Sequence, residues 1–167
     1  DCFYHYPLQV RVNKQSTSKK IVNKKAALIS IDKLKAKGHD IVFTNGCFDI
    51  VHLGHIDYLE KARQQGQKLV VGLNTDASVS ELKGPTRPVV AETARARMLA
   101  AFAFVDLVVL FGEETPQALI EYLGPNVLVK GNDYTVETIV GSDFVLQQGG
   151  RVETIQLVEG YSPTGLI

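Results

Sequence analysis

Short apolar runs rich in β-branched residues recur along the chain, at residues 41–43, 69–71, 107–110, 127–129 and 152–157. The segments between them have the spacing of helices, at 55–65, 91–103, 116–123 and 143–148, and an amphipathic helix is expected ahead of the first strand, over 23–37. Continuous apolar strands that alternate with helices are typical of a parallel sheet covered on both faces. The pattern predicts an α/β fold: a Rossmann-like doubly wound parallel sheet of about five strands in a single domain.

The N-terminal residues and the net charge indicate the domain boundary and the kinds of partner to expect. Residues 1–20 show neither a helical nor a strand period, so we expect an N-terminal extension over 1–20 and one folded domain over 21–167. The 18 basic and 18 acidic residues give a formal net charge of zero, which provides no global field for nucleic acid or anionic lipid. We therefore expect no nucleic-acid and no membrane partner, and any anion site must be local.

Cysteine content and the first residues favour a cytoplasmic protein. Cys2 and Cys47 are the two cysteines, and such a pair does not resemble a secreted disulfide scaffold. The start of the chain lacks the basic region and apolar stretch of a signal peptide, and no apolar run approaches the roughly 18 residues of a membrane span.

Small, polar and charged residues follow the predicted strands where each one ends, in segments 44–49, 72–76, 130–133 and 159–162. Ligands of doubly wound sheets bind beyond the carboxyl ends of the strands, so these residues are expected to share one site. The most specific feature is His52-Leu53-Gly54-His55 at the start of a helix. Two histidines three residues apart share a helical face, and the free amides of a helix N-terminus favour phosphate. The sequence therefore predicts a phosphate site.

The whole run 44–55 resembles the signature of the small nucleotidyltransferases, the cytidylyltransferase and adenylyltransferase superfamily. Segments 83–88, 95–101 and 129–134 look like later motifs of one branch, the heptose 1-phosphate adenylyltransferase part of ADP-heptose synthases. The resemblance implies condensation of ATP with a sugar 1-phosphate, D-glycero-D-manno-heptose 1-phosphate, to ADP-heptose and pyrophosphate for lipopolysaccharide core precursors. Such chemistry asks a protein to align two polyanions, with Mg²⁺ bound mainly through the triphosphate and no metal ligand assigned to the protein.

The resemblance also implies roles for individual residues. His52, His55 and Lys83 are the expected catalytic residues, the histidines stabilising the transition state and Lys83 acting as a mobile cation in a loop punctuated by Gly and Pro. The expected nucleotide-binding residues are Thr44, Asn45, Gly46, Cys47, Phe48, Gly54, Arg97, Lys130, Gly131, Asp133, Tyr161, Ser162 and Thr164.

Acceptor binding is expected from Asp49, Asn74, Asp76 and Arg87. Asp49 fits equally well as a turn residue that satisfies its own loop, or as a residue that orients a histidine or a loop amide. Asn74 and Asp76 are also common loop formers, and Arg87 also fits a surface charge.

Two pairs of residues within the resemblance need separate treatment. Arg95 and Arg97 cannot both face one ligand from a single helix, so one is expected at the surface and Arg97 is expected to approach phosphate. Ser162 and Pro163 suit a helix start, but Pro163 stands where the branch usually has a second hydroxyl residue.

Other function classes fit less well. A zinc site lacks a second ligand pair, a class I aminoacyl-tRNA synthetase would need a second lysine-rich motif, and a dinucleotide oxidoreductase would need a Gly-x-Gly-x-x-Gly turn. A glycerol-3-phosphate cytidylyltransferase-like enzyme and a non-catalytic nucleotide-binding module stay open as alternatives, as does a homo-oligomer.

Overall fold

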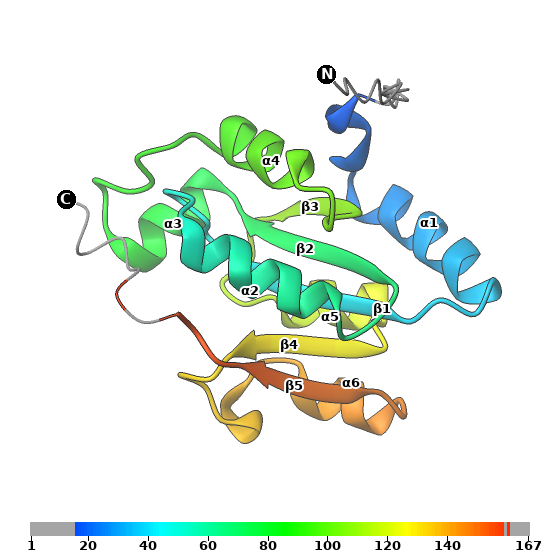
Figure 1. Cartoon of the computed structure of the whole chain (residues 1–167). Helices are drawn as coiled ribbons and strands as arrows, with labels where there is room; N and C mark the ends of the chain where they lie inside the picture. Colours follow the sequence, from blue (N-terminus) through cyan, green and yellow to red (C-terminus); the bar gives the residue numbers. More distant parts are fainter. Residues whose placement is uncertain (1–15, 159, 161–167) are drawn as a thin grey trace, which may run out of the picture.

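Five parallel strands form the centre of the molecule in a computed structural model that describes residues 16–158 and 160 (Figure 1). Their order across the sheet is β3-β2-β1-β4-β5, and every neighbouring pair is parallel. The strands are β1 (Ile41–Gly46), β2 (Lys68–Asn74), β3 (Leu107–Phe111), β4 (Val127–Gly131) and β5 (Arg151–Ile155). The expected Rossmann-like, doubly wound α/β domain is confirmed.

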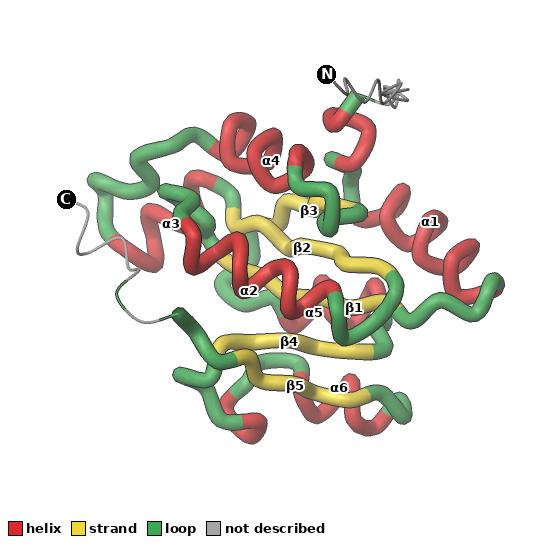
Figure 2. Tube along the Cα trace, in the orientation of Figure 1, coloured by secondary structure: helices red, strands yellow, loops and turns green. Residues whose placement is uncertain are grey.

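Helices lie on both faces of the sheet (Figure 2). They are α1 (Lys24–Ala36), α2 (Leu53–Arg63), α3 (Asp76–Lys83), α4 (Glu92–Ala101), α5 (Gln117–Leu123) and α6 (Ser142–Gln147), with 3₁₀ turns η1 (Thr17–Lys20) and η2 (Val136–Thr138). Side chains alternate along each strand, so β1 contributes to two cores: Val42 packs with α2 and α4, whereas Phe43 packs with α1, α5 and α6. Burial on both faces explains why the strands are continuous apolar runs.

Capping side chains mark where several helices begin. Asn23 accepts a hydrogen bond from the amide of Ala26 at 2.9 Å and starts α1. Thr75 does the same for the amide of Ser78 and starts α3. Helix α3 was not among the expected elements, because the sequence there was interpreted as a loop before Gly84. The Thr75 cap and the burial of Ser78 and Val79 stabilise the helix.

The last residues of the expected extension pack on the domain. Residues 17–20 form η1, and the Lys20 Nζ donates to the carbonyls of Phe102 and Val105 at 3.0 and 2.7 Å. Ile21 then makes a parallel bridge with Val108 of β3. Residues 1–15 lie outside the described part of the chain.

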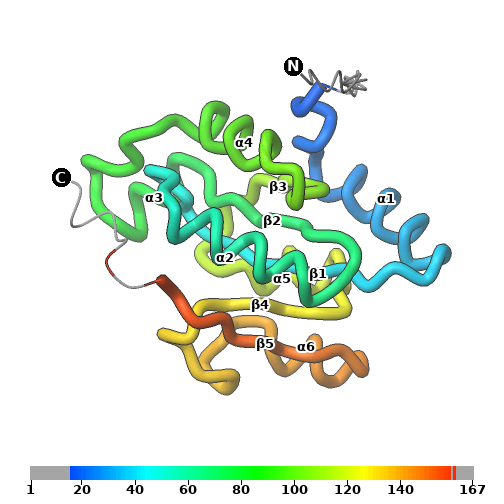
Figure 3. The backbone as a smooth tube through the Cα atoms, viewed as in Figure 1, coloured from blue at the N-terminus to red at the C-terminus, as the bar shows by residue number. Residues whose placement is uncertain are grey.

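The order of the strands determines where a ligand can enter. The chain winds from β1 outward through β2 to β3, and then crosses back so that β4 and β5 lie on the other side of β1 (Figure 3). The loops that follow β1 and β4 therefore leave the sheet in opposite directions, and a crevice opens at their carboxyl ends.

Candidate active site

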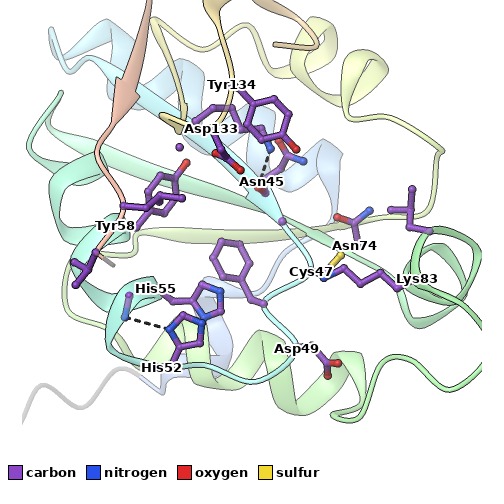
Figure 4. A pocket seen from close by; sticks show the side chains of 18 of the residues that line it. Asn45, Cys47, Asp49, His52, His55, Tyr58, Asn74, Lys83, Asp133 and Tyr134 are labelled. Atoms are coloured by element: carbon purple, nitrogen blue, oxygen red, sulfur yellow. Dashed lines mark hydrogen bonds between the residues drawn. The ribbon is translucent and has the colours of Figure 1, made fainter. Parts of the chain in front are cut away.

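A cleft of about 860 Å³ occupies this crevice (Figure 4). Its walls come from the loop after β1, the first turns of α2, the end of α3, the end of β4 and the chain after β5. Among the expected site residues, those that line it are Asn45, Gly46, Cys47, Phe48, Asp49, His52, Gly54, His55, Asn74, Lys83, Arg87, Lys130, Gly131 and Asp133. Thr44, Asp76 and Arg97 are not among the lining residues, and Tyr161, Ser162 and Thr164, like Pro163, lie outside the described part of the chain.

The two histidines form a stacked pair at the start of α2. His52 is the N-cap, and its Nδ1 accepts from the amide of Gly54 at 3.1 Å. The rings of His52 and His55 lie 3.9 Å apart between centroids and are inclined by 25°. Burial, followed by the charges of His52 and Lys83, lowers the pKa of His55 to about 4. His55 is therefore neutral at pH 7, which avoids a further buried positive charge beside Lys83.

Phe48 holds the loop that faces these histidines. Its backbone has a φ of 44°, and its ring meets His55 edge-on at 5.2 Å between centroids. A Cβ at Gly46 would lie 3.0 Å from the Phe48 ring, so glycine is the residue that lets the ring fold back over the end of β1. The ring contact links the loop after β1 to the first turn of α2.

Thr44 and Tyr58 form a buried hydrogen-bonded pair beneath the cleft. The Thr44 hydroxyl and the Tyr58 phenol are 2.7 Å apart, and the phenol also donates to the carbonyl of Val129 on β4 at 3.2 Å. Burial raises the pKa of Tyr58. Thr44 thus ties α2 to β1, and its expected contact with the α-phosphate stays a prediction.

The end of β4 contributes a second basic group. Lys130 donates to the carbonyl of Asn45 at 3.1 Å, and its Nζ lies 5.6 Å from the centre of the Tyr134 ring. Burial lowers the pKa of Lys130 to about 8, although Asp133 and Cys47 favour its charged form. A Cβ at Gly131 would lie 2.6 Å from a carboxylate oxygen of Asp133, so a larger residue at this position would displace that side chain.

Lys83 faces the histidines from the opposite wall (Figure 4). It is the last residue of α3 and not a loop residue as expected, and Gly84 ends the helix with a φ of 97°. A lysine in the last helical turn is favoured by the helix dipole. Its backbone is therefore fixed at a helix end, and its side chain lines the same cleft as Lys130.

Asp49 is held by the loop that precedes α4. Its carboxylate accepts from the amides of Val89 and Val90 at 2.8 and 2.9 Å and from the Arg87 guanidinium at 2.9 Å. Burial acts to raise the pKa of Asp49, but these three donors outweigh it and lower the pKa. Asp49 thus binds amides of the loop before α4, and its expected role in orienting groups of the site stays a prediction. Acceptor contacts of Asp49 and Arg87 stay predictions.

The arginine pair of α4 differs most from expectation. Arg97 is the exposed member, so its expected approach to phosphate finds no support in the cleft lining and stays a prediction. Arg95 is fully buried and pairs with Asp76 at 2.7 Å. That ion pair occupies Asp76 behind the cleft, whereas Asn74 lines the cleft and donates to Ser78 at 2.9 Å.

Some lining residues were missed from the sequence. Tyr58 and Tyr134 contribute aromatic surface, and Leu82 contributes apolar surface one residue before Lys83. Tyr58 lies three residues after His55 on the same helix face, a spacing that was available as a signal. Tyr134 directly follows Asp133 in a motif that had already been singled out.

Among residues 16–158 and 160, no group of three or more His, Cys, Asp or Glu side chains is placed to hold a metal ion. No helix in this part of the chain has the length and apolar character that crossing a membrane requires.

A Rossmann-like sheet with a pair of histidines at a helix N-terminus and two lysines around the same cleft has the arrangement expected of a phosphate-binding domain. A family model described as cytidylyltransferase-like matches residues 43–156, and the chain belongs to this family. It is thus a nucleotidyltransferase, in agreement with the resemblance of its motifs.

Relatives are found among bifunctional proteins. The chain is 57% identical over 150 residues to "Bifunctional protein HldE" of Magnetococcus marinus, covering 90% of this chain and 31% of the relative. It is 56% identical over 133 residues to the protein of the same name from Syntrophotalea carbinolica, covering 80% and 27%. The chain therefore spans about a third of the length of the curated relatives that it matches.

A solved structure has the same fold. The lipopolysaccharide core biosynthesis protein of Thermoplasma volcanium superposes on this chain with a TM-score of 0.58 and 26% sequence identity. The superposition covers 75% of this chain and 100% of that protein.

Proposed function

We propose that this domain transfers an adenylyl group from ATP to D-glycero-D-manno-heptose 1-phosphate, releasing pyrophosphate and forming ADP-heptose for lipopolysaccharide core synthesis. The observation that carries the proposal is the convergence of the stacked His52 and His55 with Lys83 and Lys130 around one cleft at the N-terminus of α2. High identity to proteins named HldE supports the heptose acceptor and ATP as the donor.

The geometry suits an in-line displacement. A phosphate oxygen of the sugar attacks the α-phosphorus of ATP, and the bond to pyrophosphate breaks with no covalent enzyme intermediate. The histidines lie at the helix N-terminus, where amides and ring N–H groups can donate to oxygens that gain charge. Lys83 lies on the opposite wall and neutralises charge between the two polyanions.

Nucleotidyltransferases of this kind generally use Mg²⁺ with the triphosphate. The described residues offer no cluster of three protein ligands, which fits an ion held mainly by phosphate oxygens and water. When bound, the ion would neutralise triphosphate charge, while the protein groups described above orient the phosphates.

The test offers ATP or CTP with either heptose 1-phosphate or glycerol 3-phosphate, and follows pyrophosphate and sugar nucleotide by phosphorus NMR. The proposal expects product only from ATP with the heptose phosphate. Product from CTP and glycerol 3-phosphate would instead support the cytidylyltransferase alternative, and nucleotide binding without product in all four mixtures would support a non-catalytic module. His55→Ala should abolish turnover, whereas His39→Ala, ahead of β1 and away from the cleft lining, serves as the matched control.

A further inference from the structure

Arg95 is the largest fully buried side chain among the residues that the structure describes, and it connects four segments around the cleft. Its Nε donates to the carbonyl of Val90 at 2.8 Å, and its Nη2 pairs with Asp76 at 2.7 Å. Its Nη1 donates to the carbonyl of Cys47 at 2.7 Å and to that of Asn74 at 2.9 Å. The guanidinium therefore joins the loop after β1, the end of β2, the start of α3 and the loop before α4.

The contact with Cys47 has a consequence on the other side of the same peptide bond. The Cys47–Phe48 peptide bond is trans, because the cis peptide bond found among the described residues is Arg87-Pro88. In a trans peptide the C=O and N–H groups point in opposite directions. Because the Cys47 carbonyl points to the buried Arg95, the Phe48 N–H points away from it. Phe48 itself lines the cleft, and its ring contacts His55.

The hydrogen bond from the charged Arg95 to the Cys47 carbonyl also makes the N–H of the same peptide, that of Phe48, a stronger hydrogen-bond donor. A guanidinium–carbonyl hydrogen bond draws electron density toward the oxygen, and hydrogen bonds in such a chain strengthen one another in a low-dielectric interior. Arg95 is fully buried, so solvent does not screen this effect. The Phe48 N–H is consequently more positive than an ordinary amide.

We infer that Arg95 is a positioning residue which fixes and polarises the Cys47–Phe48 peptide, so that the Phe48 amide donates to the α-phosphate as negative charge grows on it. The inference rests on the proposed function for the identity of the anion. It assigns a catalytic contribution to a side chain that does not touch the substrate, and it explains why a buried arginine rather than an apolar residue lies under the cleft. A lysine would not replace it, since an ammonium has no planar fork with which to reach four acceptors.

Arg95→Lys tests the inference, with Arg63→Lys as the matched control. Arg63 also joins a main-chain carbonyl, that of Gly66 at 2.7 Å, to a carboxylate, that of Asp106 at 3.2 Å, but outside the cleft lining. Removal of one preorganised oxyanion donor lowers kcat by about 10²–10³-fold. Arg95→Lys, which weakens such a donor, should lower kcat by about tenfold or more and change the KM for ATP by less than about threefold. Arg63→Lys should leave both constants near wild type.

Nitrogen-15 NMR of the ligand-free proteins measures the state of the Phe48 amide independently of enzyme turnover. The Phe48 amide nitrogen should move upfield in Arg95→Lys and stay in place in Arg63→Lys, because the hydrogen bond to the preceding carbonyl is weakened only in the first. Adding ATP with Mg²⁺ should shift the wild-type Phe48 amide proton downfield, and less so in Arg95→Lys. If Arg95→Lys does not fold, Asp76→Asn provides the milder change, with a smaller effect in the same direction.

An unchanged Phe48 nitrogen in a folded Arg95→Lys protein would overturn the inference, and so would a wild-type Phe48 amide that does not respond to ATP. A loss of kcat equal to that of Arg63→Lys would do the same. A wild-type protein that makes no product with heptose phosphate would instead count against the proposed function, while the response of Phe48 to ATP would still decide the role of Arg95.

Discussion

Replacing His55 with Asn should make the domain less sensitive to acid. Burial, with the charges of His52 and Lys83, lowers the pKa of the His55 ring from 6.5 to about 4 in the folded protein. The unfolded chain therefore takes up this proton first as the pH falls. The stability contributed by the neutral ring is complete above pH 6.5 and is progressively lost as the pH falls from 6.5 toward 4. Asn does not titrate, so the variant lacks this loss.

The size of the effect follows from the two pKa values. At about pH 5 a shift from 6.5 to about 4 corresponds to roughly 2 kcal/mol of lost unfolding free energy. The ring is partly exposed, and solvent screening reduces this figure to about 1 kcal/mol. Urea unfolding of both proteins at about pH 7.5 and pH 5 should therefore show a pH-dependent loss that is smaller in His55→Asn by about 1 kcal/mol.

Proton NMR of the His55 ring checks the cause directly. Its titration midpoint should lie well below 6.5 in the ligand-free protein, rise in Lys83→Met, and rise further when ATP brings a polyanion into the cleft. A midpoint of 6.5 or higher without ligand would refute the reasoning, since neither burial nor the neighbouring charges would then control the ring.

Three further outcomes concern groups around the same cleft. Because burial lowers the pKa of Lys130 to about 8, ATP affinity should weaken above about pH 8, and Lys130→Arg should remove this dependence in calorimetric titrations across the pH range. Asp49→Asn should lower unfolding free energy by about 2 kcal/mol and raise the acceptor KM, since donors from Arg87, Val89 and Val90 lose a carboxylate; equal stability in urea would contradict this. Tyr58→Phe should cost about 1–2 kcal/mol in the same assay, because it leaves buried polar partners unsatisfied.

The fold was predictable from the chain because burial on both faces leaves a simple pattern. The runs at 41–43 and 127–129 are continuous and apolar, and they became the central neighbours β1 and β4. The positions that follow them then had to share one edge, which is why Asn45, Lys130 and Asp133 meet in the cleft as expected.

The sequence did not predict helix α3 or the role of Arg95, because both depend on contacts that leave no pattern along the chain. Helix α3 is stabilised by the Thr75 cap and by packing of Val79, and neither shows as a hydrophobic period over so short a segment. Arg97 was expected to approach phosphate and Arg95 was given no role, because sequence spacing shows that two arginines differ in direction but not which one points inward. The carbonyls that satisfy Arg95 belong to residues far away in the chain, and backbone acceptors carry no sequence signal.

These buried contacts explain how a chain of zero net charge builds a site for two polyanions. Its cations are held locally: Lys83 by a helix end, Lys130 by the carbonyl of Asn45, and Arg95 beneath the loop after β1. Crowded positive charge would repel itself in an empty cleft, and the low pKa of His55 relieves that repulsion by leaving its ring neutral. Arrival of a triphosphate reverses the balance, because the ligand favours the protonated ring and the charged form of Lys130. In the proposed reaction the cleft would therefore be most positive when the phosphates are bound, and it would contribute most where charge develops on the α-phosphate.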